Sequence, residues 1–554
     1  MADGPAAFEQ AVACFREGRL DTAEKLSSRL LKQWPGSFDA LHLLGIIKLQ
    51  TGKPGAAVGF FQSALKANPD SAQALGNLAM ALSALHRDEE ALSLLDRARA
   101  LDSNSSHTLN GRGSLLLRLN RAAEALADFD RALAIDPTNA GIALNRGNAL
   151  AQLNRLGEAL AQYDAVLASQ PQFAEAHYNR GKALFALGRA AEALTAFDRA
   201  LARRPDYGKA LFSRALALQA LNRHREALAG FERLLAIEPD NADAHHNAAL
   251  VRLTLGDYRR GFREYEWRWR RTGMPGLRKL GKPLWLGEYP LGRKTILLHA
   301  EQGMGDSIHF VRYAPLLASA GARVVLELPR ELVSLFARLE GVAAVVPRGE
   351  SLPPFDVHCP LGSLPCALGT EPSSIPSAVS YLKPSKGKLA LWRERLANVS
   401  SPCVAIAWAG NASHPNDCNR SIRLPLIEPI LSLDRINVVS VQRELREEHA
   451  KLPARVTHVG QELADFDDTG AVLALADLVI AVDTAVAHLA AALGRPTWIL
   501  LPFCPDWRWM IEREDSPWYP TVRLFRQPAP GDWASVIRKV SEELGAVAAR
   551  LERR

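Results

Sequence analysis

A period of 34 residues runs through the first half of this chain and constrains its fold more than any other feature. Proline recurs on one grid of this period, with Ser103 in the single gap, and glycine or asparagine dominates a second grid. The first grid consists of Pro35, Pro69, Pro137, Pro171, Pro205 and Pro239, and the second of Gly18, Gly52, His86, Asn120, Asn154, Gly188, Asn222 and Gly256. Because glycine and asparagine tolerate a left-handed backbone, the second grid predicts a turn between two helices in every repeat.

Three further series of the same period supply the packing between helices. An unbroken alanine series lets two helices approach closely, bulky side chains then fill the space between repeats, and small residues recur in the other helix. The alanines are Ala23, Ala57, Ala91, Ala125, Ala159, Ala193 and Ala227, the bulky residues Phe61, Leu95, Phe129, Tyr163, Phe197 and Phe231, and the small ones Gly45, Ala79, Gly113, Gly147, Gly181, Ala215 and Ala249.

A helix–turn–helix unit of this length, with small, large and proline positions so placed, resembles the tetratricopeptide repeat. The resemblance covers residues 5–270 and implies about seven units and a closing helix pair, stacked into a right-handed superhelix with a concave groove. We therefore expect a repeat domain over residues 1–270.

Asparagines at Asn77, Asn145, Asn179 and Asn247 share one register of the repeat, two positions before the small residue. In such repeats this face lines the groove, where carboxamides can bond the main chain of an extended peptide. The pattern is similar to the asparagine ladder of O-GlcNAc transferase and implies a protein or peptide acceptor bound in the groove. The alternative is that each asparagine bonds its own neighbours.

Beyond Gly256 the period disappears and short apolar runs alternate with segments long enough for crossover helices, the pattern of doubly wound α/β sheets. We expect buried parallel strands at 295–299, 323–328, 343–346, 403–408, 436–441, 478–482 and 497–501. A Pro/Ser-rich stretch, 371–386, divides them into two sets. The sequence thus predicts two Rossmann-like domains facing a cleft, at 271–384 and 385–554, the second closed by a helix at about 533–552.

Ligands of such sheets bind beyond the carboxyl ends of the strands, so the loops there are candidate sites. The loop after 295–299 carries Gly303 and Gly305 and leads through Asp306 into a helical run. Glycines allow close backbone approach, and a helix start favours anionic oxygens. Asp306 is either a catalytic group facing the cleft or a helix N-cap.

Two loops of the second set could hold a diphosphate. The loop after 403–408 offers Gly410 and Asn411 in a small-residue turn and Arg420 for phosphate contact. After 478–482, a helix start could cradle a diphosphate on its backbone amides. This third loop contributes Asp483, Thr484, Ala485 and His488, and Gln442, after 436–441, lies within possible reach. His488 could equally be a core histidine.

These loops make the second half resemble the GT-B glycosyltransferases, and within them the heptosyltransferase-like group, over residues 290–530. Gly305-Asp306-Ser307-Ile308-His309 matches a Gly-Asp-x-x-His element, and the run from Asp483 through His488 to Pro496 matches Asp-Thr/Ser-x-x-x-His-Leu-Ala-x-Ala-Leu-Gly-x-Pro. The resemblance implies that Asp306 is the catalytic base and that the 483–488 loop holds the donor diphosphate. Arg420 replaces a basic residue that is usually lysine, and Ala485 replaces a glycine, so the match does not specify the donor sugar.

Composition and charge limit the classes of partner that this chain can bind. Hydrophobic residues make up 48% and charged residues 23%, as in globular proteins, and 67 Lys and Arg against 60 Asp and Glu leave a net charge of +7. This excess is mild for a chain of this size, and nucleic-acid binding would need it clustered on one face, so we expect no nucleic acid among the partners. Six cysteines without a CxxC pair, no visible secretory signal and no uninterrupted apolar span predict a cytoplasmic protein without a transmembrane segment.

We therefore expect a glycosyltransferase that moves a sugar from a nucleotide-diphosphate sugar to a hydroxyl of a protein held by the repeats. No Asp-x-Asp cluster occurs in the expected loop, so we expect no metal, and no cofactor besides the donor. Two alternatives stay open: transfer to a glycolipid or oligosaccharide, and a binding scaffold whose GT-B half is idle. An aromatic tract, 502–509 with 517–520, either lines the donor pocket or packs the domains together.

Overall fold

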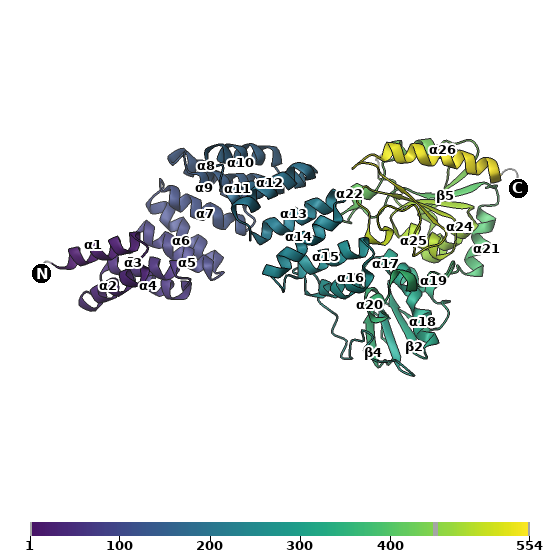
Figure 1. Cartoon of the computed structure of the whole chain (residues 1–554), viewed down its shortest axis with the longest axis horizontal. Coiled ribbons are helices and arrows are strands. Elements are labelled where there is room, and N and C mark those ends of the chain that lie inside the picture. Colours follow the sequence, from purple (N-terminus) through teal and green to yellow (C-terminus); the bar gives the residue numbers. More distant parts are fainter. Residues whose placement is uncertain (1–2, 447–451, 552–554) are drawn as a thin grey trace. The chain divides into compact units, whose positions relative to one another are not determined.

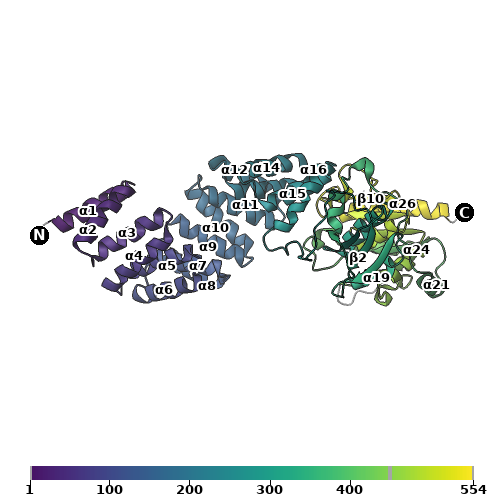
Figure 2. The same ribbon diagram turned by 90° about the horizontal axis from the view of Figure 1, so that it is seen from below.

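The computed structural model describes residues 3–446 and 452–551, and the chain divides into two compact units, Met1–Ala217 and Leu218–Arg554. The first unit is a succession of paired helices (Figures 1 and 2). Its helices are α1 (Asp3–Arg16), α2 (Leu20–Gln33), α3 (Phe38–Gln50), α4 (Pro54–Ala67), α5 (Ala72–Ala84), α6 (Asp88–Leu101), α7 (Ser106–Arg118), α8 (Ala122–Ile135), α9 (Ala140–Gln152), α10 (Leu156–Ser169), α11 (Ala174–Ala186), α12 (Ala190–Arg203) and most of α13 (Gly208–Ala220). The predicted α-solenoid is confirmed.

The backbone turns and the buried small residues lie at the positions that the 34-residue period predicts. All eight positions of the glycine and asparagine grid have a positive φ, from 57° at Asn222 to 86° at Gly256. All seven grid alanines are completely buried. A Cβ at Gly181 would lie 2.6 Å from the Phe197 ring, so the small position lets the paired helix approach.

The second unit contains the predicted α/β region with two parallel sheets. The first sheet has the order β3-β2-β1-β4 and the second β10-β9-β8-β5-β6-β7. The strands are β1 (Thr295–His299), β2 (Arg323–Leu328), β3 (Val342–Pro347), β4 (Val357–Pro360), β5 (Cys403–Ala407), β6 (Asn437–Ser440), β7 (Thr457–His458), β8 (Leu478–Val482), β9 (Thr497–Leu501) and β10 (Val522–Arg526). The sequence missed β4, β7 and β10, because the first two are very short and β10 carries Arg523 and Arg526 among its apolar residues.

Helices cover these sheets. They are α17 (Met304–Phe310), α18 (Ala314–Ser319), α19 (Arg330–Phe336), α20 (Leu364–Ala367), α21 (Lys386–Arg395), α22 (Asp417–Arg420), α23 (Leu424–Leu431), α24 (Phe466–Leu475), α25 (Ala485–Ala492) and α26 (Trp533–Leu551). The closing helix α26 was predicted, and it packs Trp533, Ile537 and Val540 onto the second sheet (Figure 1).

The last repeat helices, α14 (His224–Ile237), α15 (Ala242–Thr254) and α16 (Tyr258–Tyr265), belong to the second unit. Tyr258 and Phe262 lie in one continuous core with Trp507 and Trp518, which also extends through both sheets. The boundary predicted at residue 270 falls at the end of the short 3₁₀ helix Glu266–Arg270, whereas the compact units divide inside α13. The end of the repeat array is therefore part of the core of the α/β unit.

Replacing Tyr258 by Phe is expected to lower the free energy of unfolding of the second unit by about 1–3 kcal/mol. The Tyr258 hydroxyl accepts the hydrogen bond of the buried Trp518 Nε1 at 3.0 Å, and the substitution leaves that N–H without its acceptor. Urea unfolding measures the loss, and Tyr289→Phe, at an exposed ring, is the control. Equal stability of both variants would contradict this account.

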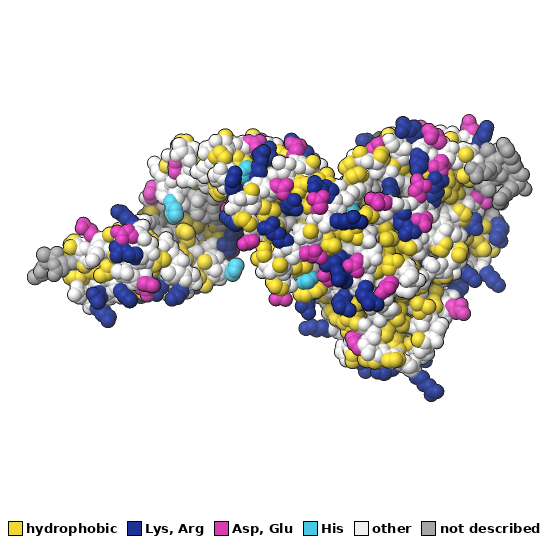
Figure 3. All heavy atoms as spheres, viewed as in Figure 1, with side chains coloured by type: hydrophobic (Ala, Val, Ile, Leu, Met, Phe, Trp, Pro, Cys, Tyr) yellow, Lys and Arg dark blue, Asp and Glu magenta, His cyan; other side chains and the backbone are white. Residues whose placement is uncertain are grey.

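In the described part of the chain, no helix is long and apolar enough to cross a membrane. Among the same residues, no group of three or more His, Cys, Asp or Glu side chains is arranged to hold a metal ion. On the face seen in Figure 3, Lys and Arg side chains are interspersed with acidic and apolar ones and form no continuous basic area.

Candidate functional site

The loops after β1 and β8 meet at the starts of α17 and α25, each of which follows the carboxyl end of its strand. A Cβ at Gly305, in α17, would lie 3.0 Å from His488 Cδ2 and 3.5 Å from Ala485 Cα, both in α25. A side chain at Gly305 would therefore separate the two helix starts. The structure thus brings the first and third predicted loops into one site.

Asp306 is held from two sides. Its Oδ2 accepts the N–H of Gly303 at 3.0 Å, and its Oδ1 accepts Arg508 Nη2 at 2.5 Å. Gly303 is the N-cap residue of α17 and Asp306 stands at the third helical position, so the alternative that Asp306 is the N-cap is wrong, although its carboxylate does cap the helix start. Burial raises the pKa of Asp306 above its usual value, and the Arg508 guanidinium opposes this shift. Asp306 is thus a carboxyl fixed by two hydrogen bonds, with its basicity raised by burial.

Arg508 was not singled out in the sequence. It lies in the short 3₁₀ helix Trp507–Trp509, is 5% exposed, and also donates to Asp506 at 2.8 Å. The Trp507 and Phe310 rings flank its guanidinium, with centroids at 4.5 and 5.1 Å. The sequence does show an arginine between two tryptophans. An arginine buried by such aromatic neighbours needs carboxylate partners, so this pattern could have indicated that Arg508 pairs with acidic residues. The aromatic tract around it packs the domains, one of the two predicted roles.

Arg420 connects the second predicted loop to the third. Its Nη1 donates to the Asp483 carbonyl oxygen at 3.0 Å. Gly410 leaves the space for it, because a Cβ there would lie 2.7 Å from Arg420 Nη2. Asn411 is exposed, and its Oδ1 accepts the N–H and hydroxyl of Ser413 at 3.0 and 2.9 Å. Gly410 and Arg420 are thus assembled with Asp483, while Asn411 shapes its own turn.

Gln442 is buried, and its Oε1 accepts the backbone N–H groups of Trp408 and Ala409 at 3.1 and 3.0 Å. Its carboxamide therefore holds the loop after β5. A pocket of about 280 Å³ opens beside this loop. Its lining comprises Trp408, Ala409, Cys418, Ser421, Ile422, Arg423, Leu424, Leu445 and Arg446.

The start of α25 combines three predicted residues. Thr484 is the N-cap residue, and its hydroxyl donates to the Val482 carbonyl oxygen at 3.2 Å. Burial and the neighbouring charge of Asp506 raise the pKa of Asp483 to about 7. His488 Nε2 lies 3.8 Å from Asp483 Oδ1, and burial lowers the His488 pKa well below its usual value, so the ring is neutral.

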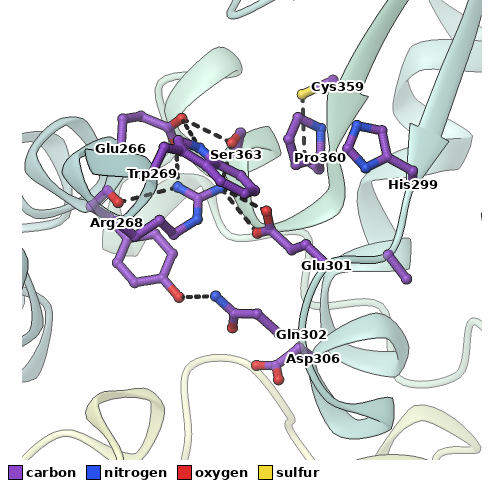
Figure 4. A network of polar contacts seen from close by, with 12 residues as sticks. Glu266, Arg268, Trp269, His299, Glu301, Gln302, Asp306, Cys359, Pro360 and Ser363 are labelled. Atoms are coloured by element: carbon purple, nitrogen blue, oxygen red, sulfur yellow. Dashed lines mark hydrogen bonds and ion pairs between the residues drawn. The ribbon is translucent and has the colours of Figure 1, made fainter. Parts of the chain in front are cut away.

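A second polar network reaches the Asp306 loop from the end of the repeats (Figure 4). The buried Arg268 donates to Glu301 at 2.9 Å, to Glu266 at 2.7 Å and to the Ser363 hydroxyl at 2.6 Å. Burial raises the pKa of Glu301 to about 7, although Arg268 opposes the shift. The sequence did not reveal this network, because its members are scattered along the chain.

The asparagine ladder bonds its own neighbours. Asn77 Nδ2 donates to His42 Nε2, Asn145 Nδ2 to Asn110 Oδ1 and Asn179 Nδ2 to Asn148 Oδ1, each at 2.9 Å. Asn247 Nδ2 donates to the Asp243 carbonyl oxygen at 2.8 Å. These contacts are those of the alternative raised from the sequence, and they fix the carboxamides in one orientation. Acceptor binding stays a prediction.

Family models match both parts of the chain. Tetratricopeptide repeat models match residues 48–109, 106–139, 144–208 and 184–253, and the model of glycosyltransferase family 9 (heptosyltransferase) matches residues 443–500. The last match includes β8, Asp483, His488 and most of β9.

Protein FlbA of Caulobacter vibrioides is 27% identical over 330 residues, which are 54% of each protein, so the chain spans about half the length of this curated relative. A tetratricopeptide repeat protein from Parabacteroides merdae is 19% identical over 43% of this chain and 93% of its own, with a TM-score of 0.37. A repeat protein from Thermus thermophilus is 26% identical over 33% of this chain and 99% of its own, with a TM-score of 0.30. From these matches, the chain is a fusion of tetratricopeptide repeats with a glycosyltransferase region that resembles family 9 over residues 443–500.

Proposed function

We propose that this protein transfers a sugar from a nucleotide-diphosphate sugar to a hydroxyl of a protein acceptor. The observation that carries the proposal is the approach of the start of α17, which carries Asp306, to the start of α25, where Gly305 lies against Ala485 and His488. Arg508 contacts Asp306 directly, and Arg420 contacts the Asp483 backbone. A basic carboxylate facing a cationic helix start suits glycosyl transfer, in which a hydroxyl loses a proton and a diphosphate departs.

In this mechanism the acceptor oxygen forms a bond to the anomeric carbon while the bond from that carbon to the diphosphate oxygen breaks. Asp306 takes the hydroxyl proton. Arg420, the backbone amides at 484–486 and the His488 ring stabilise the charge that develops on the departing diphosphate. Arg508 orients the base, since it holds one carboxylate oxygen in place.

The pocket beside Trp408 supports the choice of donor. It lies next to the Gly410 loop, and it is lined by Trp408, four aliphatic residues, Cys418, Ser421 and two arginines. An apolar wall with a few polar groups suits a heterocyclic base. We assign the nucleobase of the donor to this pocket.

Nucleotide binding is expected to weaken by about tenfold between pH 6 and pH 8. With a pKa of about 7, Asp483 is mostly neutral below pH 7 and becomes negative above it. A unit negative charge beside the diphosphate is expected to cost on the order of 1–2 kcal/mol or more. Calorimetric titration with ADP, UDP and GDP measures the effect, and Asp483→Asn, which cannot ionise, is the reference for ionisation of the nucleotide itself. An equal pH dependence in both proteins would contradict the prediction.

For the acceptor, replacing Asn77, Asn145, Asn179 and Asn247 together by Ala is expected to raise the KM for a protein substrate by about tenfold or more. Each lost hydrogen bond contributes about 0.5–1.5 kcal/mol. Hydrolysis of the donor should not change. Asn68→Ala with Asn104→Ala, at exposed positions after α4 and α6, is the matched control. An unchanged KM would favour a glycolipid or oligosaccharide acceptor.

The test of the whole proposal combines donor binding with product mass. The chain is titrated with a panel of nucleotide sugars and then incubated with candidate acceptors, whose intact mass reports the sugar added. We expect turnover without added metal and in the presence of a chelator. Absence of binding by every nucleotide sugar would leave the scaffold alternative.

A further inference from the structure

The hydroxyl of Tyr519 lies between two histidine rings that come from the two sheet regions of the second unit. Its oxygen is 3.1 Å from His309 Nδ1 and 2.9 Å from His488 Nδ1. His309 is in α17, after the first sheet's β1, and His488 is in α25, after β8 of the second sheet. All three side chains are buried.

One hydroxyl proton cannot serve both ring nitrogens. Both imidazoles are neutral, because burial, and then the nearby charges of Arg312 and Arg508, lower their pKa values well below the usual range. A neutral imidazole carries its proton on only one nitrogen. If Tyr519 donates to one Nδ1, the other Nδ1 must therefore donate to the Tyr519 oxygen.

The surroundings of the two Nε2 atoms, which do not face Tyr519, decide the direction of its two hydrogen bonds to the histidines. His488 Nε2 faces the Asp483 carboxyl, with 3.8 Å between Nε2 and Oδ1, and a proton there is electrostatically favourable. His309 Nε2 is buried without a hydrogen-bond partner. An orphaned acceptor is tolerated in protein interiors more readily than an orphaned N–H. Both conditions are met when His309 Nδ1–H donates to Tyr519 and Tyr519 donates to His488 Nδ1.

We infer that Tyr519 is a positioning residue that holds His488 in the tautomer with its proton on Nε2, so that this N–H is presented to the loop at Asp483. Under the proposed function, this N–H donates to an oxygen of the departing diphosphate. The role toward the diphosphate rests on that function, whereas the tautomer does not. The two parts are therefore tested separately.

The tautomer is read from long-range ¹H–¹⁵N spectra of the full chain labelled with ¹⁵N-histidine, without nucleotide. His488→Gln identifies the His488 signals among the 14 histidines. We expect the wild-type ring to be protonated on Nε2, and Tyr519→Phe to shift both nitrogens toward values for mixed tautomers. Protonation on Nδ1 in the wild type, or an unchanged spectrum in Tyr519→Phe, would overturn the inference. If Tyr519→Phe does not fold, the protonation site of His488 in the wild-type spectrum is sufficient to test the inference.

Tyr381→Phe is the matched control for this spectrum. The Tyr381 hydroxyl donates to the Ile308 carbonyl oxygen and accepts from Arg312, both at 3.0 Å, next to the same cluster. We expect the His488 signals to stay unchanged in this variant. A shift as large as that in Tyr519→Phe would mean that Tyr519 donates to Tyr381 instead, and the inference would be wrong.

The role of the N–H is tested by the affinity for ADP, UDP and GDP. Glutamine places a donor near the position of Nε2, and asparagine places one near Nδ1. We expect His488→Gln to bind within about threefold of wild type, and His488→Asn and Tyr519→Phe about tenfold more weakly. Equal affinities of the two His488 variants would overturn this role. If no nucleotide binds the wild type, the proposed function fails while the tautomer result stands.

Discussion

Substitution of Asp306 by Asn is expected to lower kcat for sugar transfer by about 10²–10⁴-fold, the usual contribution of a general base. Asparagine keeps the size of the side chain, and its carbonyl oxygen can still accept the Gly303 N–H. Arg508 retains its bond to Asp506, so its guanidinium keeps one carboxylate partner. The loss should therefore appear in kcat, with little change in donor affinity or in the melting temperature.

Asp506→Asn is the matched control, because Asp506 shares Arg508 with Asp306 but is not the proposed base. We expect this variant to lose less than about tenfold in kcat. If both variants lose activity equally, the charge of Arg508 matters and proton removal by Asp306 does not. Full activity of a folded Asp306→Asn protein would reject Asp306 as the base.

Substitution of Arg268 by Met is expected to lower the free energy of unfolding of the second unit by about 3–5 kcal/mol, as when one partner of a buried ion pair is removed. The side chains of Arg268, Glu301 and Glu266 are only 6%, 9% and 17% exposed. Without the guanidinium, two carboxylates stay buried close together. Urea unfolding monitored by tryptophan fluorescence gives the magnitude.

The Arg268→Met loss should grow with pH. Glu301 has a pKa of about 7 in the folded protein against an ordinary value of 4.5. Its contribution to the free energy of unfolding is therefore complete below pH 4.5 and is lost as pH rises through 7. Above pH 7 the carboxylate is ionised and depends on Arg268 as its counter-charge. We expect a larger deficit at pH 8 than at pH 5.5, and partial recovery in the double variant with Glu301→Gln. Arg270→Met, at an exposed arginine two residues away, should change stability by less than about 0.5 kcal/mol. Equal deficits at both pH values would contradict the role given to Glu301.

Much of the fold could be predicted from the sequence because the patterns that specify it lie within short stretches of the chain. The glycine and asparagine grid predicts a left-handed backbone at single residues such as Asn154, and the alanine series predicts a buried helix face. Apolar runs such as 295–299 and 478–482 are strands of the length predicted. The candidate loops could be placed at the carboxyl ends of those strands, but their meeting at Gly305 and Ala485 is visible only in the structure.

The sequence by itself determined the repeat architecture, the parallel strands and the loops that carry Asp306, Arg420 and Asp483, because each depends on periodicity or spacing within a few dozen residues. Only the tertiary structure decided that Arg508 holds Asp306, since these residues are 202 positions apart. It also decided that Tyr519 joins His309 to His488 and that Arg268, just after the last repeat helix, bonds Glu301 in the loop before Asp306. Buried polar partners are selected by desolvation and geometry in the assembled core, and no local pattern in the chain encodes that choice.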